Sequence, residues 1–505
     1  MMISLRPRFT PCAQVLLARG MLTARPRAAT RTAPRRERSV QLPRYALLCL
    51  LLLAGPLPVV RAAPPNFIFI MADDLGYGDL GCFGQRRIQT PQIDRLARQG
   101  IRFTDFYAGS TVCAPSRCVL MTGYHTGHAF IRGNGKDNLR PSDVTVAEVL
   151  KPAGYATALI GKWGLGHEGS SGLPTRQGFD QFFGYLDQHH AHNYYPSFLV
   201  RNESRVPLNN VVPREGKFGQ GVASKKVDYS HDLITREALE FVDRHHDQPF
   251  FLYWSLTIPH ANNEARAKGM EVPDYGIYGD RAWPEPQKGH AAMITRMDSD
   301  VGQLLARLER HGIADNTVVF FTSDNGPHRE GGNDPDFQNS NGPLRGIKRD
   351  LTEGGIRVPM IVRWPGKTPA GVTSDFVGGF QDIMPTLAAL ADSRAHVPDD
   401  IDGISFAPTL SGDATAQRQH DFLYWAFYER RGARALRRGR WKAVQQPIRS
   451  AVRLYDLKND LGEQSDVAAA YPQRVAKLVR LMDGADISTP RWKFPGAVRK
   501  KTPAN

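Results

Sequence analysis

Two pairs of oxygen-bearing side chains stand directly after apolar runs of the chain, Asp73-Asp74 and Asp324-Asn325. Carboxylate and amide oxygens are hard ligands, which suit Ca²⁺ or Mg²⁺ rather than zinc. A single Asp-Asp pair at such a place is usually a solvated turn or a helix cap. Two pairs at the ends of two apolar runs instead predict a binding site for one divalent cation.

A cysteine opens a short run of distinctive composition. Residues 113–123 read Cys-Ala-Pro-Ser-Arg-Cys-Val-Leu-Met-Thr-Gly. Taken alone, Cys113 could be a thiolate nucleophile at a helix start or an ordinary buried thiol. Beyond residue 62 the chain holds three cysteines, Cys82, Cys113 and Cys118, so at least one is unpaired. A protein of this size with three cysteines is not built on disulfides.

A glycine pattern near residue 80 matches a dinucleotide fingerprint only in part. Gly76, Gly78 and Gly81 fit G-x-G-x-x-G directly after an apolar run. The fingerprint needs a helix that begins at the glycines, whereas here a loop follows, and two aspartates would repel a pyrophosphate. Gly161-Lys162 is not a phosphate-binding loop either, because Trp163 replaces the required Ser or Thr.

Four apolar runs have the composition of strands, at residues 66–71, 156–160, 250–256 and 317–321. Runs without alternation indicate strands buried on both faces, as in a parallel sheet between helices. Helices are expected at 232–244, at 291–311, and from Pro91 to Gly100 with Thr90 as N-cap. Ligands of such sheets bind beyond the carboxyl ends of the strands, so the polar residues that follow the runs should converge.

From about residue 415 the pattern changes to short antiparallel strands. These are expected at 422–428, 433–437, 441–445 and 453–456, with a helix at 471–482. The sequence therefore predicts three parts: a targeting segment at 1–62, a catalytic domain at 63–415, and a small α+β domain with an antiparallel sheet at 416–505.

The charge of the chain is concentrated in its first residues. The net charge is +15, but residues 1–62 hold eleven arginines and one acid, leaving 54 basic and 49 acidic residues after them. No nucleic-acid partner is therefore expected. The arginine-rich start, the apolar run 45–54 and Val60-Arg61-Ala62 resemble a cleaved signal, with a mitochondrial presequence as the alternative. We expect an exported protein, periplasmic or secreted if bacterial, without a membrane span after cleavage.

Residues 113–123 resemble the sulfatase signature C-x-P-S-R-x-x-L-x-T-G at every fixed position. Further blocks resemble sulfatases in the family's order, at 66–81, 161–163, 259–260, 323–326, 344–348, 353–359, 382–386 and 455–460. The resemblance implies the fold of the alkaline phosphatase superfamily: an α/β sandwich with a large, mostly parallel sheet between helices, and a smaller C-terminal sheet.

The resemblance implies a modified nucleophile at position 113. In this family the signature cysteine is oxidised to formylglycine by a formylglycine-generating enzyme. One hydroxyl of the hydrated aldehyde would attack sulfur, and the second would lose its proton and expel sulfate. The cation, Ca²⁺ with Mg²⁺ as the alternative, would contact this residue and the oxygens of Asp73, Asp74, Asp324 and Asn325.

The resemblance also implies roles for four basic residues. Arg117 would stabilise the hydrated residue at position 113. Lys162 and Lys348 would bind the sulfate oxygens and oppose the charge that develops there. His260, with Lys348, would protonate the departing alcohol.

One position departs from the family pattern. Many sulfatases read G-K-W-H-L-G, where the histidine contacts the formylglycine hydroxyls, but this chain has Gly164 in its place. His167 and the cluster His189-His190-Ala-His192 could compensate, and His192 is assigned to the substrate site. The variant occurs among bacterial carbohydrate sulfatases and so favours a sulfated carbohydrate over a simple aryl sulfate. The alternatives are a phosphodiesterase or phosphonate monoester hydrolase of the same superfamily, and a carbohydrate-binding protein without catalysis.

Overall fold

The computed structural model describes residues 63–135, 137–487 and 489–495. The predicted targeting segment, residues 1–62, lies outside the described residues. Within the described residues, no helix has both the length and the apolar character needed to cross a membrane.

The larger sheet has a parallel centre and mostly antiparallel edges. Within the described residues its strand order is β11-β2-β10-β9-β1-β8-β4-β5-β6-β7. The parallel centre consists of β9 (Thr317–Ser323), β1 (Asn66–Ala72), β8 (Phe250–Ser255), β4 (Ala156–Lys162) and β5 (Gln181–Tyr185). The edges are β11 (Val372–Ser374), β2 (Ile101–Phe103), β10 (Met360–Arg363), β6 (Phe198–Arg201) and β7 (Ser204–Pro207). The segments predicted as strands form adjacent members of the centre, which confirms the α/β fold.

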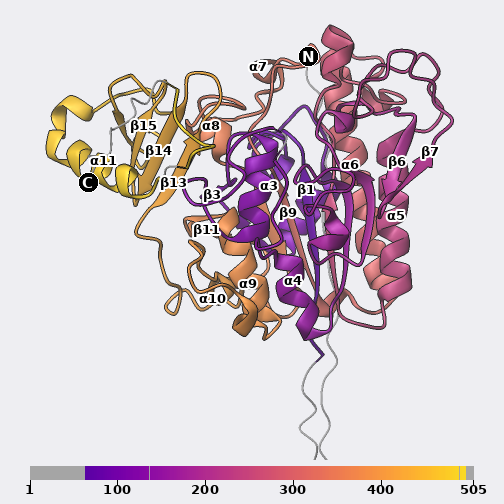
Figure 1. The fold of residues 1–505 in the computed structure, drawn as a ribbon, viewed down its shortest axis with the longest axis horizontal. Coiled ribbons are helices and arrows are strands. Elements are labelled where there is room, and N and C mark those ends of the chain that lie inside the picture. Colours follow the sequence, from indigo (N-terminus) through magenta and orange to yellow (C-terminus); the bar gives the residue numbers. More distant parts are fainter. Residues whose placement is uncertain (1–62, 136, 488, 496–505) are drawn as a thin grey trace, which may run out of the picture. The chain divides into compact units, whose positions relative to one another are not determined.

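Alternate side chains of the central strands enter two separate cores. In β1, Phe67 and Phe69 belong to one core, and Ile68 and Ile70 belong to the other. The first core includes α3 (Cys113–Thr122), α4 (Val146–Leu150) and α9 (Ile383–Leu390). The second includes α2 (Pro91–Arg98), α5 (Ser230–His245) and α6 (Glu285–Arg310). Figure 1 labels α3, α4 and α9 of the first set and α5 and α6 of the second. Burial on both faces explains the unbroken apolar runs.

Thr90 is the N-cap of α2 and Pro91 its first residue, as predicted, but the Thr90 side chain makes no capping hydrogen bond. The Thr90 hydroxyl accepts a hydrogen bond from the Gly81 amide at 2.9 Å instead of capping the helix. The amides of Gln92 and Ile93 donate to the carboxylate of Asp298 in α6, at 2.9 and 2.8 Å. A residue distant in sequence therefore satisfies the free amides of this helix.

The second sheet is antiparallel throughout and follows the predicted pattern. It consists of β13 (Leu423–Phe427), β14 (Ala433–Arg438), β15 (Trp441–Gln445) and β16 (Arg453–Asp456). One face packs against α11 (Pro472–Gly484) through Leu478 and Met482, as Figure 1 shows in yellow. The other face packs against Tyr107 and Ile356, and Trp425 Nε1 donates to the Ala108 carbonyl at 2.9 Å. The boundary at residues 415–416 stays a prediction.

Short elements connect the larger ones in the described residues. They are β3 (Phe106–Tyr107), which pairs with β12 (Gly378–Gly379), and the helices α7 (Pro335–Gln338), α8 (Glu353–Ile356) and α10 (Ala407–Leu410).

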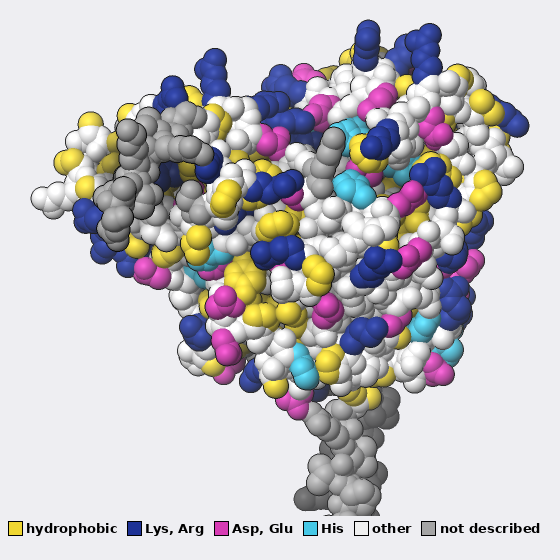
Figure 2. All heavy atoms as spheres, viewed as in Figure 1, with side chains coloured by type: hydrophobic (Ala, Val, Ile, Leu, Met, Phe, Trp, Pro, Cys, Tyr) yellow, Lys and Arg dark blue, Asp and Glu magenta, His cyan; other side chains and the backbone are white. Residues whose placement is uncertain are grey.

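Figure 2 shows Lys and Arg side chains spread over one face of the protein, with Asp and Glu side chains between them. This mixture agrees with the nearly balanced charge of residues 63–505.

Candidate active site

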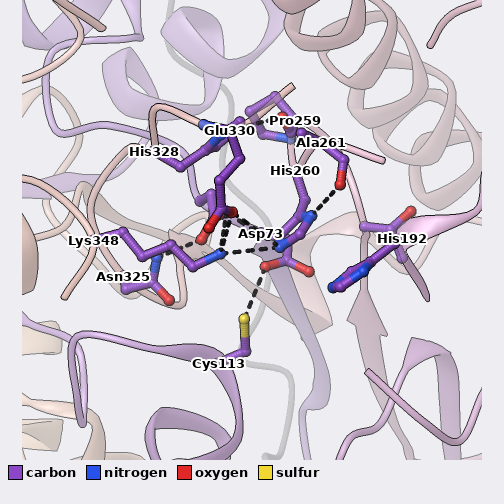
Figure 3. Close-up of polar contacts among 12 residues, drawn as sticks. Asp73, Cys113, His192, Pro259, His260, Ala261, Asn325, His328, Glu330 and Lys348 are labelled. Atoms are coloured by element: carbon purple, nitrogen blue, oxygen red, sulfur yellow. Dashed lines mark hydrogen bonds and ion pairs between the residues drawn. The ribbon is translucent and has the colours of Figure 1, made fainter. Parts of the chain in front are cut away.

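The predicted functional side chains converge at the carboxyl end of the parallel strands (Figure 3). They follow or end four central strands: Asp73 and Asp74 after β1, Lys162 in β4, His260 after β8, and Asp324 and Asn325 after β9. All of them are buried. Asp74 has a φ of 64°, a left-handed conformation that costs a non-glycine residue energy and is typical of functional sites.

Cys113 is the first residue of α3 and faces the carboxylates. Its side chain is 2% exposed, and its Sγ lies 3.5 Å from Asp73 Oδ1. The next amide of the helix, that of Ala114, donates to Asn134 Oδ1 at 3.0 Å. A loop asparagine thus satisfies one of the free amides beside Cys113.

The serine and arginine of the signature fix α3 against the sheet. The Ser116 hydroxyl donates to the Asp324 carbonyl at 2.6 Å. The fully buried Arg117 guanidinium donates to the Lys162 carbonyl and to Asp324 Oδ2, each at 2.8 Å, and to the Ser255 hydroxyl. Because these partners lie on three strand ends, the signature positions Cys113 with respect to the whole site.

The predicted ligands form a set of buried oxygens. Asp73, Asp74, Asp324 and Asn325 are each 0% exposed. Asn325 Nδ2 donates to Asp74 Oδ1 at 2.6 Å, while Asn325 Oδ1 is buried without a hydrogen-bond partner. A buried oxygen without a partner requires an explanation, and a hard cation provides one. The residues therefore fit an oxygen-bound divalent cation.

Two buried lysines neutralise the two aspartates that follow β1. Lys162 Nζ lies 2.6 Å from Asp73 Oδ2, and Lys348 Nζ lies 2.8 Å from Asp74 Oδ2. Burial alone would raise the pKa of both aspartates, but Lys162 beside Asp73 and Lys348 beside Asp74 hold each pKa below its usual value. Asp324 behaves differently, because burial and the nearby Asp73 raise its pKa to about 7. The described centre thus contains closely packed charges of both signs.

His260 is positioned as a neutral imidazole. Its Nδ1 donates to the Ala261 carbonyl at 2.7 Å, so Nε2 is free to accept from Lys348 Nζ at 3.0 Å. Burial, together with Lys348, lowers the pKa of His260 to about 3. Lys348 thus donates a hydrogen bond to the neutral His260 ring at the edge of the site.

Sequence reasoning missed two members of the site, Glu330 and His328. Glu330 accepts from Lys348 at 3.1 Å and from Arg349 at 2.6 Å. The ring of His328 stacks near that of His260, with centroids 5.8 Å apart. Both residues lie in the loop that follows Asp324-Asn325 at the end of β9. This closeness in the chain was the signal by which sequence reasoning could have found them.

Of the four histidines considered from sequence, His192 lies beside the centre. It belongs to the short 3-10 helix at His190–His192, and its ring stacks on that of His260 with centroids 5.0 Å apart and planes inclined by 12° (Figure 3). Its Nδ1 lies 3.3 Å from the Glu264 carboxylate. A carboxylate only accepts hydrogen bonds, so Nδ1 carries the proton and Nε2 is left as an acceptor.

The other three histidines contact different groups. His167 Nδ1 lies 3.3 Å from Asp187 Oδ2, and His189 Nδ1 lies 3.2 Å from Asp187 Oδ1. The ring of His190 packs at 4.5 Å from that of Phe198. His167 and His190 line a neighbouring cavity.

Gln188 occupies the space beside Gly164. Gly164 has a φ of 80°, and a Cβ there would lie 3.0 Å from Gln188 Cγ. Its amide donates to the Leu186 carbonyl at 3.0 Å, which continues the pairing of β4 and β5. A histidine at this position would need both a left-handed backbone and a displaced Gln188.

The glycines of the partial dinucleotide pattern serve backbone packing. A Cβ at Gly76 would lie 2.1 Å from the Ser340 carbonyl oxygen, and one at Gly78 would lie 2.6 Å from the Gly342 amide. The loop at residues 339–342 therefore fills the place where a helix and a pyrophosphate would have to lie.

Comparison with known proteins agrees with this arrangement. The family model described as Sulfatase matches residues 65–393, and the one described as N-sulphoglucosamine sulphohydrolase, C-terminal, matches residues 347–483. Human arylsulfatase A is 34% identical over 425 residues, which cover 78% of this chain and 77% of that protein. N-acetylgalactosamine-6-sulfatase of Sus scrofa is 33% identical over 386 residues, covering 73% and 70%.

Solved structures with the same fold include the crystal structure of Ps i-CgsB. It superposes with a TM-score of 0.71 at 28% identity and covers 85% of this chain and 94% of that one. The phosphonate monoester hydrolase of Agrobacterium radiobacter has a TM-score of 0.59 at 20% identity, covering 83% and 95%, which indicates a shared fold alone.

Proposed function

The chain belongs to the sulfatase family and is a sulfuric ester hydrolase, and from this premise we propose that it desulfates carbohydrates with a formylglycine made from Cys113 and a divalent cation. The observation that most supports this mechanism is the convergence of Cys113 with buried carboxylates and buried lysines at one end of the sheet. Such a centre suits an anionic ester that must be held, neutralised and attacked in one place.

The formal charges of the described centre are balanced before a cation is added. The carboxylates are those of Asp73, Asp74, Asp324 and Glu330, and the cations are those of Arg117, Lys162, Lys348 and Arg349. A divalent cation would give the centre a positive excess, which favours the binding of a sulfate ester. Asp73, Asp74, Asp324 and Asn325 would hold this cation, which when bound would withdraw charge from sulfur.

The chain's own residues have distinct roles in the proposed reaction. Hydrated formylglycine at position 113 would supply the attacking oxygen and the second hydroxyl that permits release of sulfate. Lys162 and Lys348 would bind the sulfate oxygens. Arg117 would hold the hydrated residue. A proton would move from Lys348 Nζ to His260 Nε2, 3.0 Å away, and from there to the oxygen of the departing alcohol.

His192 would take the place of the histidine that is absent at position 164. Glu264 holds the proton on its Nδ1, so Nε2 can accept a hydrogen bond from a hydroxyl of the hydrated residue. The carboxylate would also stabilise the imidazolium that forms when His192 takes a proton.

The carbohydrate substrate is supported by the relatives. One of them is named N-acetylgalactosamine-6-sulfatase, and Ps i-CgsB has been crystallised in complex with k-i-k-neocarrahexaose. We further propose that a formylglycine-generating enzyme modifies Cys113 and that the protein is exported, with Ca²⁺ as its cation.

Mass spectrometry of the tryptic peptide at residues 103–117, from protein made in its own host, tests the proposal. Active enzyme should carry an aldehyde at position 113, and Cys113→Ala should be inactive but folded. Cys82→Ala, outside the site, serves as the matched control and should stay active. Full activity with an unmodified Cys113 thiol would refute the mechanism, and faster turnover of an aryl phosphodiester than of an aryl sulfate would refute the reaction.

A further inference from the structure

A cavity of about 410 Å³ lies beside the active site at the carboxyl end of β5. Its volume falls within the range of small-ligand pockets, roughly 300–1,000 Å³. Strand β5 is paired with β4, so the cavity begins one strand away from Lys162. Its walls include His167, Asp187, Lys217 and Phe218. A larger cavity, of about 580 Å³, lies between α5 and α6 and contains none of the candidate site residues.

A row of rings leads from the active site into the 410 Å³ cavity. The ring of His192 lies between that of His260, at 5.0 Å, and that of His189, at 5.6 Å. The ring of His189 is stacked 6.2 Å from that of Phe218, which in turn is stacked 5.5 Å from that of His167. A continuous series of ring contacts therefore connects the cavity with the catalytic centre.

Among the charged side chains that line the cavity, that of Lys217 has no acidic partner within the described residues. Arg205 forms a two-point ion pair with Glu168, at 2.7 and 3.0 Å, and Asp187 contacts the two histidines described above. Lys217 is exposed and its Nζ lies 5.6 Å from the centroid of the Phe218 ring. Among the described residues, no carboxylate lies within ion-pair distance of Lys217.

We propose that this cavity is a carbohydrate subsite, which binds the sugar adjacent to the one being desulfated and recognises a second anionic group on that sugar. The C–H groups of a pyranose carry weakly positive hydrogens, which would pack favourably against the part of the Phe218 ring that lines the cavity. Lys217 stands at the same ring and would pair with a sulfate or carboxylate of the bound sugar. Asp187 would accept hydrogen bonds from sugar hydroxyls.

The subsite rests on the proposed function and makes it more specific. A simple aryl sulfate would fill the sulfate centre and leave the cavity empty. The preferred substrate would instead be an oligosaccharide with at least two anionic groups, one bound at Lys162 and Lys348 and another at Lys217. Binding energy from the second sugar would then distinguish substrates that share the same ester.

Binding measurements in a Cys113→Ala background test the subsite without any need for turnover. The ligands are k-i-k-neocarrahexaose and sulfated oligosaccharides of the heparan and chondroitin types, titrated by calorimetry. Lys217→Ala and Phe218→Ala should each raise the Kd of the tightest ligand about tenfold, the equivalent of about 1.4 kcal/mol. Lys225→Ala, a lysine of the same loop outside the cavity, is the matched control and should change Kd less than about twofold.

The charge of the ligand gives a second readout. Binding should weaken with salt, and this dependence should be reduced in Lys217→Ala but retained in Phe218→Ala. Lys217 is exposed, so its substitution does not threaten the fold. If no oligosaccharide binds, or if all variants bind equally, the subsite is refuted. Turnover of an aryl sulfate by the unsubstituted enzyme would still support the proposed function, so the two failures are distinguishable.

Discussion

Lys442 of β15 forms a buried ion pair that joins the antiparallel sheet to α8. Its side chain is 0% exposed, and its Nζ lies 2.7 Å from Glu353 Oε1 and 3.1 Å from Glu463 Oε1. Glu353 also accepts from Arg357 at 2.6 Å and from the Tyr107 hydroxyl at 2.7 Å. The other oxygen of Glu463 accepts the Glu353 amide at 2.6 Å, so Glu463 depends on Lys442 for its cation.

Replacing Lys442 with methionine keeps the unbranched stem of the side chain but removes its ammonium group. Breaking a buried ion pair by removing one partner costs about 3–5 kcal/mol. We expect a loss of stability at the lower end of this range, about 3 kcal/mol, because Glu353 keeps Arg357 as a positively charged partner. At about 2.1 cal/mol/K of unfolding entropy per residue, this lowers the melting temperature of residues 62–505 by about 3 °C.

The loss should depend on pH in a definite direction. Burial raises the pKa of Glu463 even though Lys442 opposes this effect. Without Lys442 the folded protein holds the Glu463 proton more tightly still, whereas the unfolded chain releases it near pH 4.3. Between the pKa of Glu463 in the unfolded chain and its higher pKa in the folded protein, the folded state binds more protons than the unfolded state. The stability of the variant therefore falls as pH rises through this range. Lys442→Met should therefore lose more stability at pH 8 than at pH 5.

Differential scanning calorimetry at both pH values measures the effect. The double variant Lys442→Met/Glu463→Gln should recover part of the loss, because it removes the carboxylate left without a cation. Arg440→Met, at an exposed pair with Asp456, is the control and should change the melting temperature little. A melting temperature within 1 °C of the unsubstituted protein at pH 8, or a further loss in the double variant, would refute the reasoning.

Three further outcomes are expected. Chelation of divalent cations should lower both activity and melting temperature, and Ca²⁺ should restore both, because a cation that binds only the folded state stabilises it. An unchanged melting temperature would contradict the cation site. His192→Ala should lower the kcat for an aryl sulfate about 10²–10⁴-fold, and His246→Ala on the surface should not, as steady-state kinetics would show. Gly161→Ala should yield little folded protein, because its Cβ would lie 1.7 Å from the Ser255 carbonyl oxygen. Gly84 also has a positive φ but lies in open space, so Gly84→Ala should lower the free energy of unfolding by only about 1–2 kcal/mol, as measured by thermal unfolding.

The sequence predicted the fold and the core of the site because both depend on local patterns. A strand buried on both faces must be apolar throughout, so β1, β4, β8 and β9 were recognisable as unbroken runs. The residues that follow parallel strands must meet at one edge of the sheet, which placed Asp73, Lys162, His260 and Asp324 together before any coordinates were known.

The remaining contacts join residues that no local pattern connects. Asn134 satisfies an amide of α3 and Asp298 satisfies amides of α2, each from a distant segment. Glu330 contributes a carboxylate to Lys348 from a loop without regular structure. His192 was chosen from several histidines without a physical reason in the sequence, because which of them reaches His260 depends on the path of the loop after β5.

The replacement at position 164 has a consequence for how this enzyme can change. Gly164 leaves room for Gln188, and the loop that contains Gln188 goes on to place His192 on His260. A histidine at 164 would need a left-handed backbone and would press on the Gln188 side chain, whose Cγ lies 3.0 Å from the place of a Cβ. Removing His192 alone would take away its proposed substitute. We therefore expect a histidine at 164 and His192 to be alternatives that depend on each other, so that an exchange of one for the other requires a change at Gln188 as well.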